Sequence, residues 1–456
     1  ELRERGVRRV DGDVLVDQRF YDDQTTPPAF EQKPNEWAAF RAPVSALAVN
    51  ENTVTLEIRP SEAGQTAHAF FEPPGFVDVD GAVTTGTGAG ADTVGLVLSK
   101  NGSRLGAKLS GDVGEDAKVV RFTRRVEDPT LLAGYVLRAA LEQAQIKVTG
   151  EVKSGAGKGP VIAKHLSAPL SSLLYALGKN SDNFYAEMIF KSLAAEKKGR
   201  PAHAQDSAQL VEKTIAELDA NDAGIVIKNG SGLYDANRVT TSSVVHLLRS
   251  AWRNPAIQPE YVAQLSVGGV DGTLHGRFRS EHERGVVRAK TGTLDDTIAL
   301  SGYVLGPPGK EPIAFSILFN KIPGHAAKAR GDADRGLYVR PEVAAFLREQ
   351  AVPAADIVTP NQFELEWLTG RKIGSLADAL AAGDALRGRG PQCVVCTSLS
   401  RDGGDATMIE TLALDNSGAW LVATPRLPQV PNGSGDLFAA LFLGQRLLGR
   451  PVPNAL

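Results

Sequence analysis

The pattern of apolar residues changes twice along the chain, and these changes limit the folds that it can adopt. Up to about residue 165, short runs with period-two alternation lie between Gly, Pro and Asn residues, which is typical of β-rich structure. From about residue 166 to residue 252, apolar residues recur every three or four positions, as in amphipathic helices. Beyond about residue 331, β runs and helical runs alternate, which indicates an α/β arrangement. We therefore expect three regions, at 1–165, 166–330 and 331–456.

The middle region combines helices with a small sheet. Helices are expected at 169–177, 184–195, 204–218 and 240–252. Strands are expected after them, at 285–290, 297–305 and 312–319. The turn Gly306–Gly309 is short enough to pair the last two strands antiparallel. Helices followed by a meander predict an α+β domain.

The first region is expected to hold one helix among its strands. Strands are predicted at 13–17, 53–58, 93–98 and 118–122. The helix spans 128–145, with Asp128 as its N-cap and Pro129 in its first turn. Its apolar face is predicted to carry Leu132, Val136, Leu137 and Ala140.

Composition excludes some classes of protein. A chain of 456 residues is long enough for two to four domains. The net charge is −3, and neither end carries the basic excess that binding to nucleic acid requires. No apolar run approaches the roughly 20 residues that cross a bilayer, and no signal peptide opens the sequence. We therefore expect neither a nucleic-acid partner nor a membrane span.

Two short polar motifs point to chemistry. Ser181-Asp182-Asn183 precedes a predicted helix, and Lys290-Thr291-Gly292-Thr293 ends a predicted strand. Together they suggest two walls of a serine acyl-transfer site, in which a Lys-Thr-Gly strand faces a Ser-x-Asn loop. Taken alone, Ser181-Asp182-Asn183 is equally well interpreted as a helix N-cap before Phe184.

Four ordered motifs carry a family resemblance: Asn180–Glu187, Asn229–Leu233, Gly269–Leu274 and Val287–Leu294. Over about residues 1–330 the chain resembles the D-alanyl-D-alanine carboxypeptidase/endopeptidase family of low-molecular-mass penicillin-binding proteins. The resemblance implies a penicillin-binding, β-lactamase-like transpeptidase fold in which residues 1–165 form a large β-rich insertion. It also implies peptidoglycan stem peptides and β-lactams as ligands, and no cofactor or metal.

The resemblance implies roles for the motif residues. Lys290 would bind the substrate's terminal carboxylate, with the Thr291 hydroxyl and Gly292 beside it. The backbone N–H of Thr293 would be one oxyanion donor. Ser181 would relay a proton to the leaving amine, and Asn183 would hold the peptide amide. The turn at 230–232 is assigned no chemistry.

The nucleophile that this family needs is a Ser followed three residues later by Lys, and no Ser in the chain has Lys at that position. The chain opens at Glu1, and its methionines are Met188 and Met408. We therefore expect the nucleophile to lie upstream of the printed sequence, and the printed polypeptide not to hydrolyse D-Ala-D-Ala. A non-catalytic fragment is the alternative interpretation of the whole chain.

The cysteines of the third region favour a buried strand. Cys393 and Cys396 lie in an apolar run, where Cys behaves as a small hydrophobic residue. A redox or zinc site is the alternative, although no second Cys pair or His completes a metal site. A strand at 356–359, a helix at 376–386 and a hairpin across 408–423 complete the predicted region.

Four further motifs lie in the third region: Gly331-Asp332, Gly336–Val339, Thr359–Glu366 and Gly433–Asp436. Through them the third region resembles the C-terminal part of pyridoxal kinases, in the ribokinase-like superfamily. The resemblance implies that Asp436 is the catalytic base for pyridoxal. Glycines before a helix present N–H groups to an anion, so Gly433, Ser434 and Gly435 would form an anion hole. By the same resemblance, the residues expected to position ATP and Mg²⁺ are Thr359, Asn361, Glu364 and Thr397.

The two resemblances imply different compartments. Carboxypeptidases of this type act outside the cytoplasmic membrane, which implies a periplasmic or extracellular location for residues 1–330. Pyridoxal kinases use cytoplasmic ATP, and the kinase-like domain is only partial. Because no Pro/Gly/Ser-rich linker separates the regions, the junction at 325–336 suggests a truncated gene fusion or an assembly join. For Asn361 and Glu364, a polar helix start is the alternative interpretation.

Overall fold

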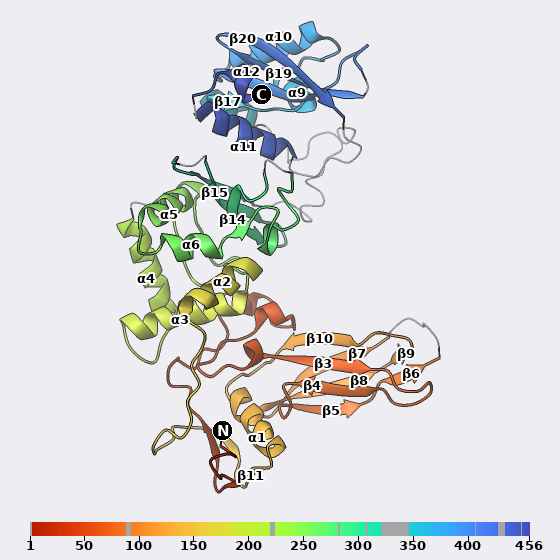
Figure 1. The fold of residues 1–456 in the computed structure, drawn as a ribbon, viewed down its shortest axis with the longest axis vertical. Helices are drawn as coiled ribbons and strands as arrows, with labels where there is room; N and C mark the ends of the chain where they lie inside the picture. The colour runs from red at the N-terminus through yellow and green to blue at the C-terminus, as the bar shows by residue number, and fades with distance from the viewer. Residues whose placement is uncertain are drawn as a thin grey trace. The chain divides into compact units, whose positions relative to one another are not determined.

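The computed structural model divides the chain into two units, drawn in Figure 1. It describes residues 2–87, 93–218, 224–280, 283–306, 309–320, 345, 347–405, 407–426, 434–447 and 449–456. The first unit comprises Glu1–Leu294 with Ala299–Leu318, and the second comprises Asp295–Ile298 with Phe319–Leu456. The junction at 325–336, Gly336–Val339 and Gly433 lie outside the described residues. The expected boundary at residue 165 stays a prediction.

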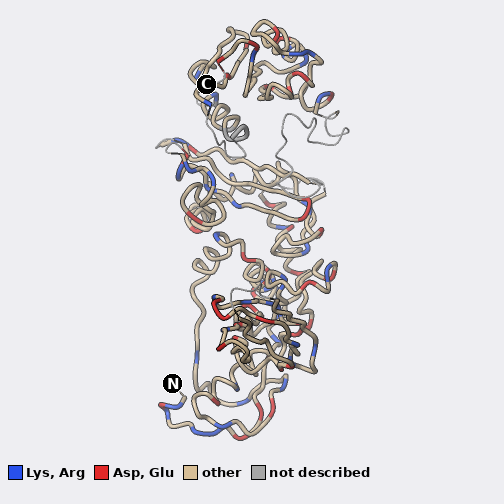
Figure 2. The backbone as a smooth tube through the Cα atoms, turned by 90° about the vertical axis from the view of Figure 1, so that its right-hand side faces the viewer, with Lys and Arg blue, Asp and Glu red and all other residues tan. Residues whose placement is uncertain are grey.

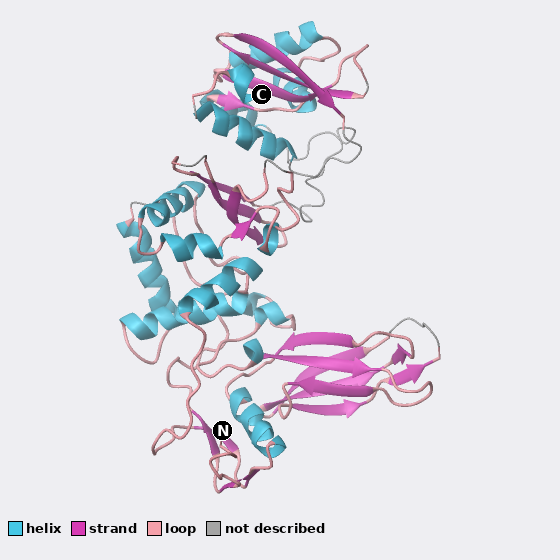
Figure 3. Ribbon diagram, in the orientation of Figure 1, coloured by secondary structure: helices cyan, strands magenta, loops and turns pink. Residues whose placement is uncertain are grey.

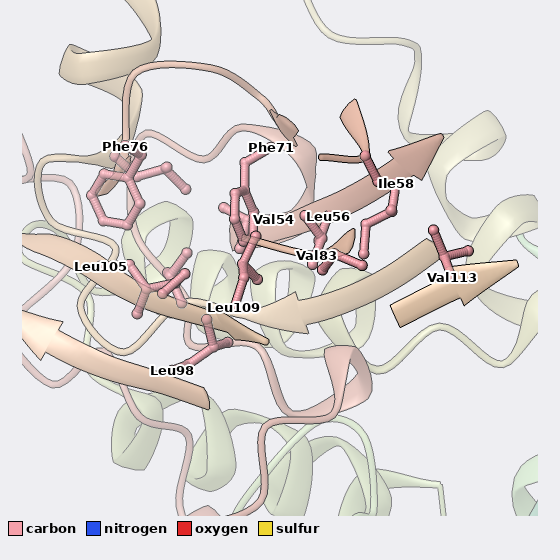
Figure 4. Close-up of a cluster of buried hydrophobic side chains, with 14 residues drawn as sticks. Val54, Leu56, Ile58, Phe71, Phe76, Val83, Leu98, Leu105, Leu109 and Val113 are labelled. Carbon is pink, nitrogen blue, oxygen red and sulfur yellow. The ribbon is translucent and has the colours of Figure 1, made fainter. Parts of the chain in front are cut away.

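Two three-stranded sheets dominate the β-rich part of the first unit. One has the order β10-β3-β4, with β10 at Val120–Arg125, β3 at Thr53–Arg59 and β4 at His68–Glu72. The other has the order β5-β8-β7, with β5 at Val77–Gly81, β8 at Arg104–Ser110 and β7 at Gly95–Asn101. Figure 4 shows the buried side chains that both sheets contribute to one apolar core, including Leu56, Phe71 and Leu109.

Short strand pairs complete this part. They are β1 (Arg9–Val10) with β11 (Lys147–Val148), β2 (Val14–Val16) with β12 (Val152–Ser154), and β6 (Thr84–Gly86) with β9 (Asp112–Gly114). The strands predicted at 13–17, 53–58, 93–98 and 118–122 each overlap an observed strand.

The helix of this part, α1, begins later than predicted. It spans Leu132–Gln143, because the Asp128 carboxylate accepts the N–H of Thr130 and so caps the preceding turn. The predicted apolar face was also wrong in part, since Leu137 is 49% exposed. The buried face is centred on Gly134, where an added Cβ would lie 2.5 Å from side-chain atoms of Val16 and Val152.

The predicted helices of the middle region are confirmed. They are α2 (Leu170–Asn180), α3 (Asn183–Lys197), α4 (Ala204–Glu217) and α5 (Thr241–Arg253). Figure 3 shows them beside a sheet of order β13-β14-β15-β16. Its strands are β13 (Ser266–Val267), β14 (Val287–Thr293), β15 (Ile298–Val304) and β16 (Ile313–Phe319). Strand β13 and helix α6 (Gln258–Gln264) were not predicted.

The second unit is built on a sheet of order β17-β18-β19-β20. Strands β17 (Ile357–Val358) and β18 (Cys393–Leu399) are parallel, whereas β19 (Met408–Asp415) and β20 (Gly418–Pro425) are antiparallel neighbours. Its helices include α8 (Val352–Ala354), α9 (Gln362–Thr369), α10 (Leu376–Arg387), α11 (Ser434–Leu447) and α12 (Val452–Ala455).

The alternation of β18 places the two cysteines on opposite faces of this sheet. Cys396 packs in the apolar cluster that contains Leu365 and Leu386, whereas Cys393 packs in a separate cluster with Phe442. Burial raises the pKa of Cys393 to about 11 and that of Cys396 to about 12, so both stay as thiols at neutral pH. The buried-strand prediction is confirmed.

Charged residues of both signs are spread along the described parts of the chain. Figure 2 shows Lys and Arg interspersed with Asp and Glu along the backbone. Among the described residues, no helix is both long enough and apolar enough to cross a bilayer.

Candidate active site

The Ser-Asp-Asn motif forms the junction between helices α2 and α3. Helix α2 ends at Asn180, and Ser181 takes a left-handed conformation with φ 58°. Asp182 is the N-cap of α3, because its carboxylate accepts the N–H of Tyr185 at 2.9 Å. Asn183 donates its side-chain amide to the carbonyl of Phe40 at 3.1 Å. The N-cap interpretation therefore holds for Asp182, and it leaves the Ser181 hydroxyl exposed for other contacts.

The Lys-Thr-Gly strand meets this junction. Lys290 lies on β14, and its Nζ donates to Ser181 Oγ at 2.6 Å and to the carbonyl of Thr291 at 2.7 Å. Burial lowers the pKa of the Lys290 ammonium below its ordinary value of 10.5. Two motifs 109 residues apart in sequence therefore share one hydrogen bond. The sequence analysis expects them to form two walls of one site.

The loop 269–274 joins both walls of the site, a role that the sequence analysis missed. Thr291 Oγ1 donates to Thr273 Oγ1 at 2.8 Å, and Lys179 of α2 pairs with Asp271 at 2.8 Å. The loop was identified as a motif of the family, but its contacts were not predicted. The one signal in the sequence was the glycine at position 272. In the structure Gly272 adopts φ 56°, and a Cβ added there would lie 2.3 Å from Ser266 Oγ.

Helix α3 is also tied to the Asn-Gly-Ser-Gly turn at 229–232. The buried carboxylate of Glu187 accepts the N–H groups of Gly230 at 3.1 Å and Ser231 at 2.8 Å. Burial raises the pKa of Glu187 above its ordinary value. This turn therefore fixes the helix that begins at Asn183.

The remaining predicted residues of this wall are Gly292 and Thr293. Both belong to β14, and Thr293 is its last, exposed residue. A Cβ added at Gly292 would lie 3.3 Å from the Ala299 side chain. A cavity of about 550 Å³ lies in the first unit, lined by residues that include Asp22, Lys191 and His203 and, from the motifs, Glu187.

In the second unit, part of the predicted nucleotide site comes together. Asn361 and Thr397 form a parallel bridge, and the Thr397 N–H donates to the carbonyl of Pro360 at 2.9 Å. Thr359 lies directly after β17, so these residues share the carboxyl end of two parallel strands. Such ends are the usual ligand-binding edge of an α/β sheet.

The side chains of Asn361 and Glu364 are occupied by a helix cap. Asn361 Oδ1 accepts the N–H of Glu364 at 2.9 Å, and Glu364 Oε2 accepts the N–H of Asn361 at 2.8 Å. These contacts are the ones expected from the alternative interpretation, in which Asn361 and Glu364 form a polar helix start. Helix α11 begins at Ser434, but the side chains of Ser434 and Asp436 lie outside the described part.

A resident metal site does not emerge from these residues. The described parts of the chain hold no group of three His, Cys, Asp or Glu side chains that could bind a metal ion. Mg²⁺ bound with a nucleotide is usually held by one or two carboxylates. One expected carboxylate, that of Glu364, accepts the Asn361 N–H through Oε2.

Comparison with known proteins identifies the larger region. The profile of the D-Ala-D-Ala carboxypeptidase 3 (S13) family matches residues 1–338. The chain belongs to this family. A D-alanyl-D-alanine carboxypeptidase of Actinomadura sp. (strain R39) is 35% identical over 353 residues, which cover 73% of this chain and 64% of that protein. The fold of this S13 region is shared with penicillin binding protein 4 from Haemophilus influenzae, with a TM-score of 0.60, 23% identity and 73% of each chain covered.

The C-terminal region matches a different family. The phosphomethylpyrimidine kinase profile matches residues 333–456. A pyridoxal kinase of Rubrobacter xylanophilus is 44% identical over 211 residues, which cover 45% of this chain and 67% of the kinase. The chain thus spans about two thirds of the length of each curated relative, one from the S13 family and one kinase. Both expected resemblances are confirmed, and so is the fold class.

Proposed function

We propose that the first unit carries the substrate-recognition part of a serine-type D-Ala-D-Ala carboxypeptidase/endopeptidase that acts on peptidoglycan stem peptides. The observation that carries the proposal is the 2.6 Å hydrogen bond between Lys290 Nζ and Ser181 Oγ. It brings a partly buried cation and an exposed hydroxyl to one point, which suits a peptide that ends in a carboxylate. A location outside the cytoplasmic membrane belongs to the same proposal.

The motif residues then have distinct roles. Lys290 attracts the terminal carboxylate, and the hydroxyl of Ser181 is placed to relay a proton to the leaving amine once a nucleophile attacks the peptide. Asn183 holds the peptide amide once its present hydrogen bond to the Phe40 carbonyl is replaced by one to the peptide. The N–H of Thr293 serves as an oxyanion donor. No covalent step is assigned, because no Ser in the printed sequence has Lys three residues later.

Recognition is tested with two peptides that differ only at the carboxyl end. The 456-residue polypeptide is titrated with a D-Ala-D-Ala-terminated stem peptide and with its C-terminal amide. A charge-assisted hydrogen bond contributes about 1.5–3 kcal/mol, so we expect the acid to bind about 10–100-fold more tightly. Lys290→Gln should abolish the preference, whereas Lys213→Gln, at an exposed residue of α4, should keep it. Equal binding of acid and amide by the wild type would contradict the proposal.

The same titration has a predicted pH dependence. Only the protonated Lys290 attracts a carboxylate, so the preference for the acid falls as pH rises through the pKa of Lys290. Burial places that pKa below 10.5. The preference should therefore fade at lower pH than an ordinary lysine would allow. A preference that persists unchanged above pH 10.5 would show that another cation binds the carboxylate.

Covalent chemistry is tested separately with a fluorescent penicillin. The printed polypeptide should show no label that survives denaturation. The positive control is penicillin binding protein 4 from H. influenzae, whose structure has been solved in complex with a β-lactam. Stable labelling of the printed polypeptide would reveal a nucleophile outside the Ser-x-x-Lys pattern.

A second candidate function concerns residues 345–456. The bridge between Asn361 and Thr397 at the ends of parallel strands favours a nucleotide site, with Thr359 beside it. We propose that this edge binds ATP, that Gly433, Ser434 and Gly435 hold phosphate oxygens, and that Asp436 is the base for pyridoxal. Calorimetric titration with ATP, on the wild type and on Thr397→Val, tests whether this edge binds ATP. Phosphorylation of pyridoxal tests the catalytic part of the proposal. A cytoplasmic location for this region belongs to the same proposal.

A further inference from the structure

The loop 269–274 is anchored at its acidic residue. Asp271 accepts the N–H of Val267 at 2.8 Å, and both of its carboxylate oxygens accept from Lys179 Nζ at 2.8 Å. The Lys179 side chain is only 8% exposed and also donates to the Leu265 carbonyl. Because Lys179 lies on the helix that ends just before Ser181, the loop has a fixed position relative to the Ser-Asp-Asn wall.

Three further contacts fix Thr273 at the other wall. Its N–H donates to Ser266 Oγ at 3.1 Å, and its Oγ1 lies 3.2 Å from the same atom. Its Oγ1 also accepts from Thr291 Oγ1 at 2.8 Å. Gly272 permits this approach, since any side chain there would collide with Ser266.

The direction of the Thr273 hydroxyl follows from these donors. Ser266 is 0% exposed, so its hydroxyl proton needs an acceptor inside the protein, and the Thr273 oxygen lies within reach. A hydroxyl oxygen has two acceptor lone pairs and one proton. When Ser266 and Thr291 both donate to Thr273, its lone pairs are filled and its proton remains free to donate. Thr273 is exposed, so this proton is available to a ligand beside Thr291, the residue that follows Lys290 on β14.

We propose that Thr273 is a further substrate-binding residue, which donates its hydroxyl proton to the terminal carboxylate that Lys290 attracts. This inference rests on the proposed function of the first unit. In the arrangement seen here, the proton of Thr291 is held by Thr273, so Thr273 is the better placed of the two hydroxyls to act as donor. Thr291 then acts as a positioning residue for Thr273.

The test uses the same pair of peptides, the acid and the amide. Thr273→Val removes the donor and keeps the shape of the side chain. We expect the acid to bind about 10-fold more weakly, as for a lost hydrogen bond to a charged group, and the amide to bind as before. Thr273→Ser, which keeps the hydroxyl, should restore most of the affinity for the acid. Thermal unfolding of each variant accompanies the titrations, and Thr273→Ala replaces the Val variant if that variant fails to fold.

Each outcome separates this inference from the proposed function. If the wild type prefers the acid and Lys290→Gln abolishes the preference, the proposed function stands. An unchanged or stronger affinity of Thr273→Val for the acid would then overturn only the role of Thr273. An equal loss for acid and amide would also overturn it, because that result is what a purely structural role predicts. A wild type without preference for the acid contradicts both.

Discussion

The two units of the chain differ in the polar side chains that they bury. Every buried polar or charged side chain in the described parts of the chain belongs to the first unit, including Lys179, Glu187 and Lys191. The described core of the second unit is apolar apart from its two thiols. Buried charges have few alternative partners, so they fix the loops that they contact. The first unit therefore holds its site by buried pairs, whereas the second presents exposed strand ends and helix caps.

The tetrapeptide Asn-Gly-Ser-Gly occurs in both units and illustrates the difference. In the first copy, the N–H groups of Gly230 and Ser231 bind an anion that the protein itself supplies, the carboxylate of Glu187. In the second copy, Ser434 opens helix α11, and we propose that a phosphate takes the equivalent place. The same local sequence thus serves as a structural anchor in one unit and as a proposed ligand site in the other.

The largest effect on stability is expected from a substitution at Lys179. Lys179→Met leaves Asp271 without its cation, and breaking such a partly buried pair costs about 3 kcal/mol. Lys372→Met is the matched control in the second unit, because Lys372 also pairs with a carboxylate, that of Glu366, but is 93% exposed. There we expect less than about 1 kcal/mol. Hydrogen exchange of peptides from each unit measures the two free energies separately, and equal effects would contradict the comparison.

A somewhat smaller effect is expected at Glu187. Glu187→Ala leaves the N–H groups of Gly230 and Ser231 without their acceptor, at a cost of about 2 kcal/mol. Hydrogen exchange of the first unit again measures the loss.

Glu187 also predicts a pH dependence with a definite sign. Burial raises the pKa of the folded carboxyl above 4.5, so the folded state holds this proton more tightly than the unfolded chain does. The stability of the wild type relative to Glu187→Gln should therefore be highest in acid. It should fall as pH rises from about 4.5 through the raised pKa. A difference that grows with pH in this window would show that the N–H donors lower the pKa of Glu187 more than burial raises it.

In the second unit, the comparison predicts a modest effect on stability but a specific effect on binding. Asn361→Ala removes the cap of α9, which costs about 1 kcal/mol. Ser375→Ala removes the same kind of capping box from α10 and serves as the control. Both variants should lose similar stability, whereas only Asn361→Ala should weaken ATP binding. If the two variants bind ATP equally well, Asn361 has a capping role alone.

The sequence predicted the elements of the site better than the contacts that connect them. Helices α2 and α3 and strand β14 follow from periodicity, and the family resemblance implied that Ser181 and Lys290 line one site. The ion pair between Lys179 and Asp271 joins residues 92 positions apart, and no local pattern specifies such a partner. The proposed role of Thr273 could not be predicted for the same reason, because it depends on which hydrogen-bond donors surround the Thr273 hydroxyl oxygen.

The exposure of Leu137 shows that a local pattern also fails to predict which face of a helix is buried. Apolar spacing alone placed Leu137 on the buried face of α1, yet the residue that packs most closely there is Gly134. The valines of β2 and β12 approach the helix at this glycine, and this tertiary contact decides which face is buried. A continuous apolar run, by contrast, was sufficient to predict that β18 is buried on both faces, because this pattern depends only on the strand itself.

The smallest effect is expected at the cysteines, where the structure predicts no redox response. Cys393 and Cys396 lie in separate apolar clusters on opposite faces of β18, so their sulfur atoms cannot form a disulfide without rearrangement of the sheet. Intact-mass measurement after mild oxidation should find both thiols in the native protein, and denaturation should make them reactive to iodoacetamide. The variant Cys396→Ala should behave as the wild type does, apart from the loss of one alkylation site. A mass lower by two hydrogen atoms after oxidation of the native protein would show that the strand opens. The redox interpretation of the pair would then regain its basis.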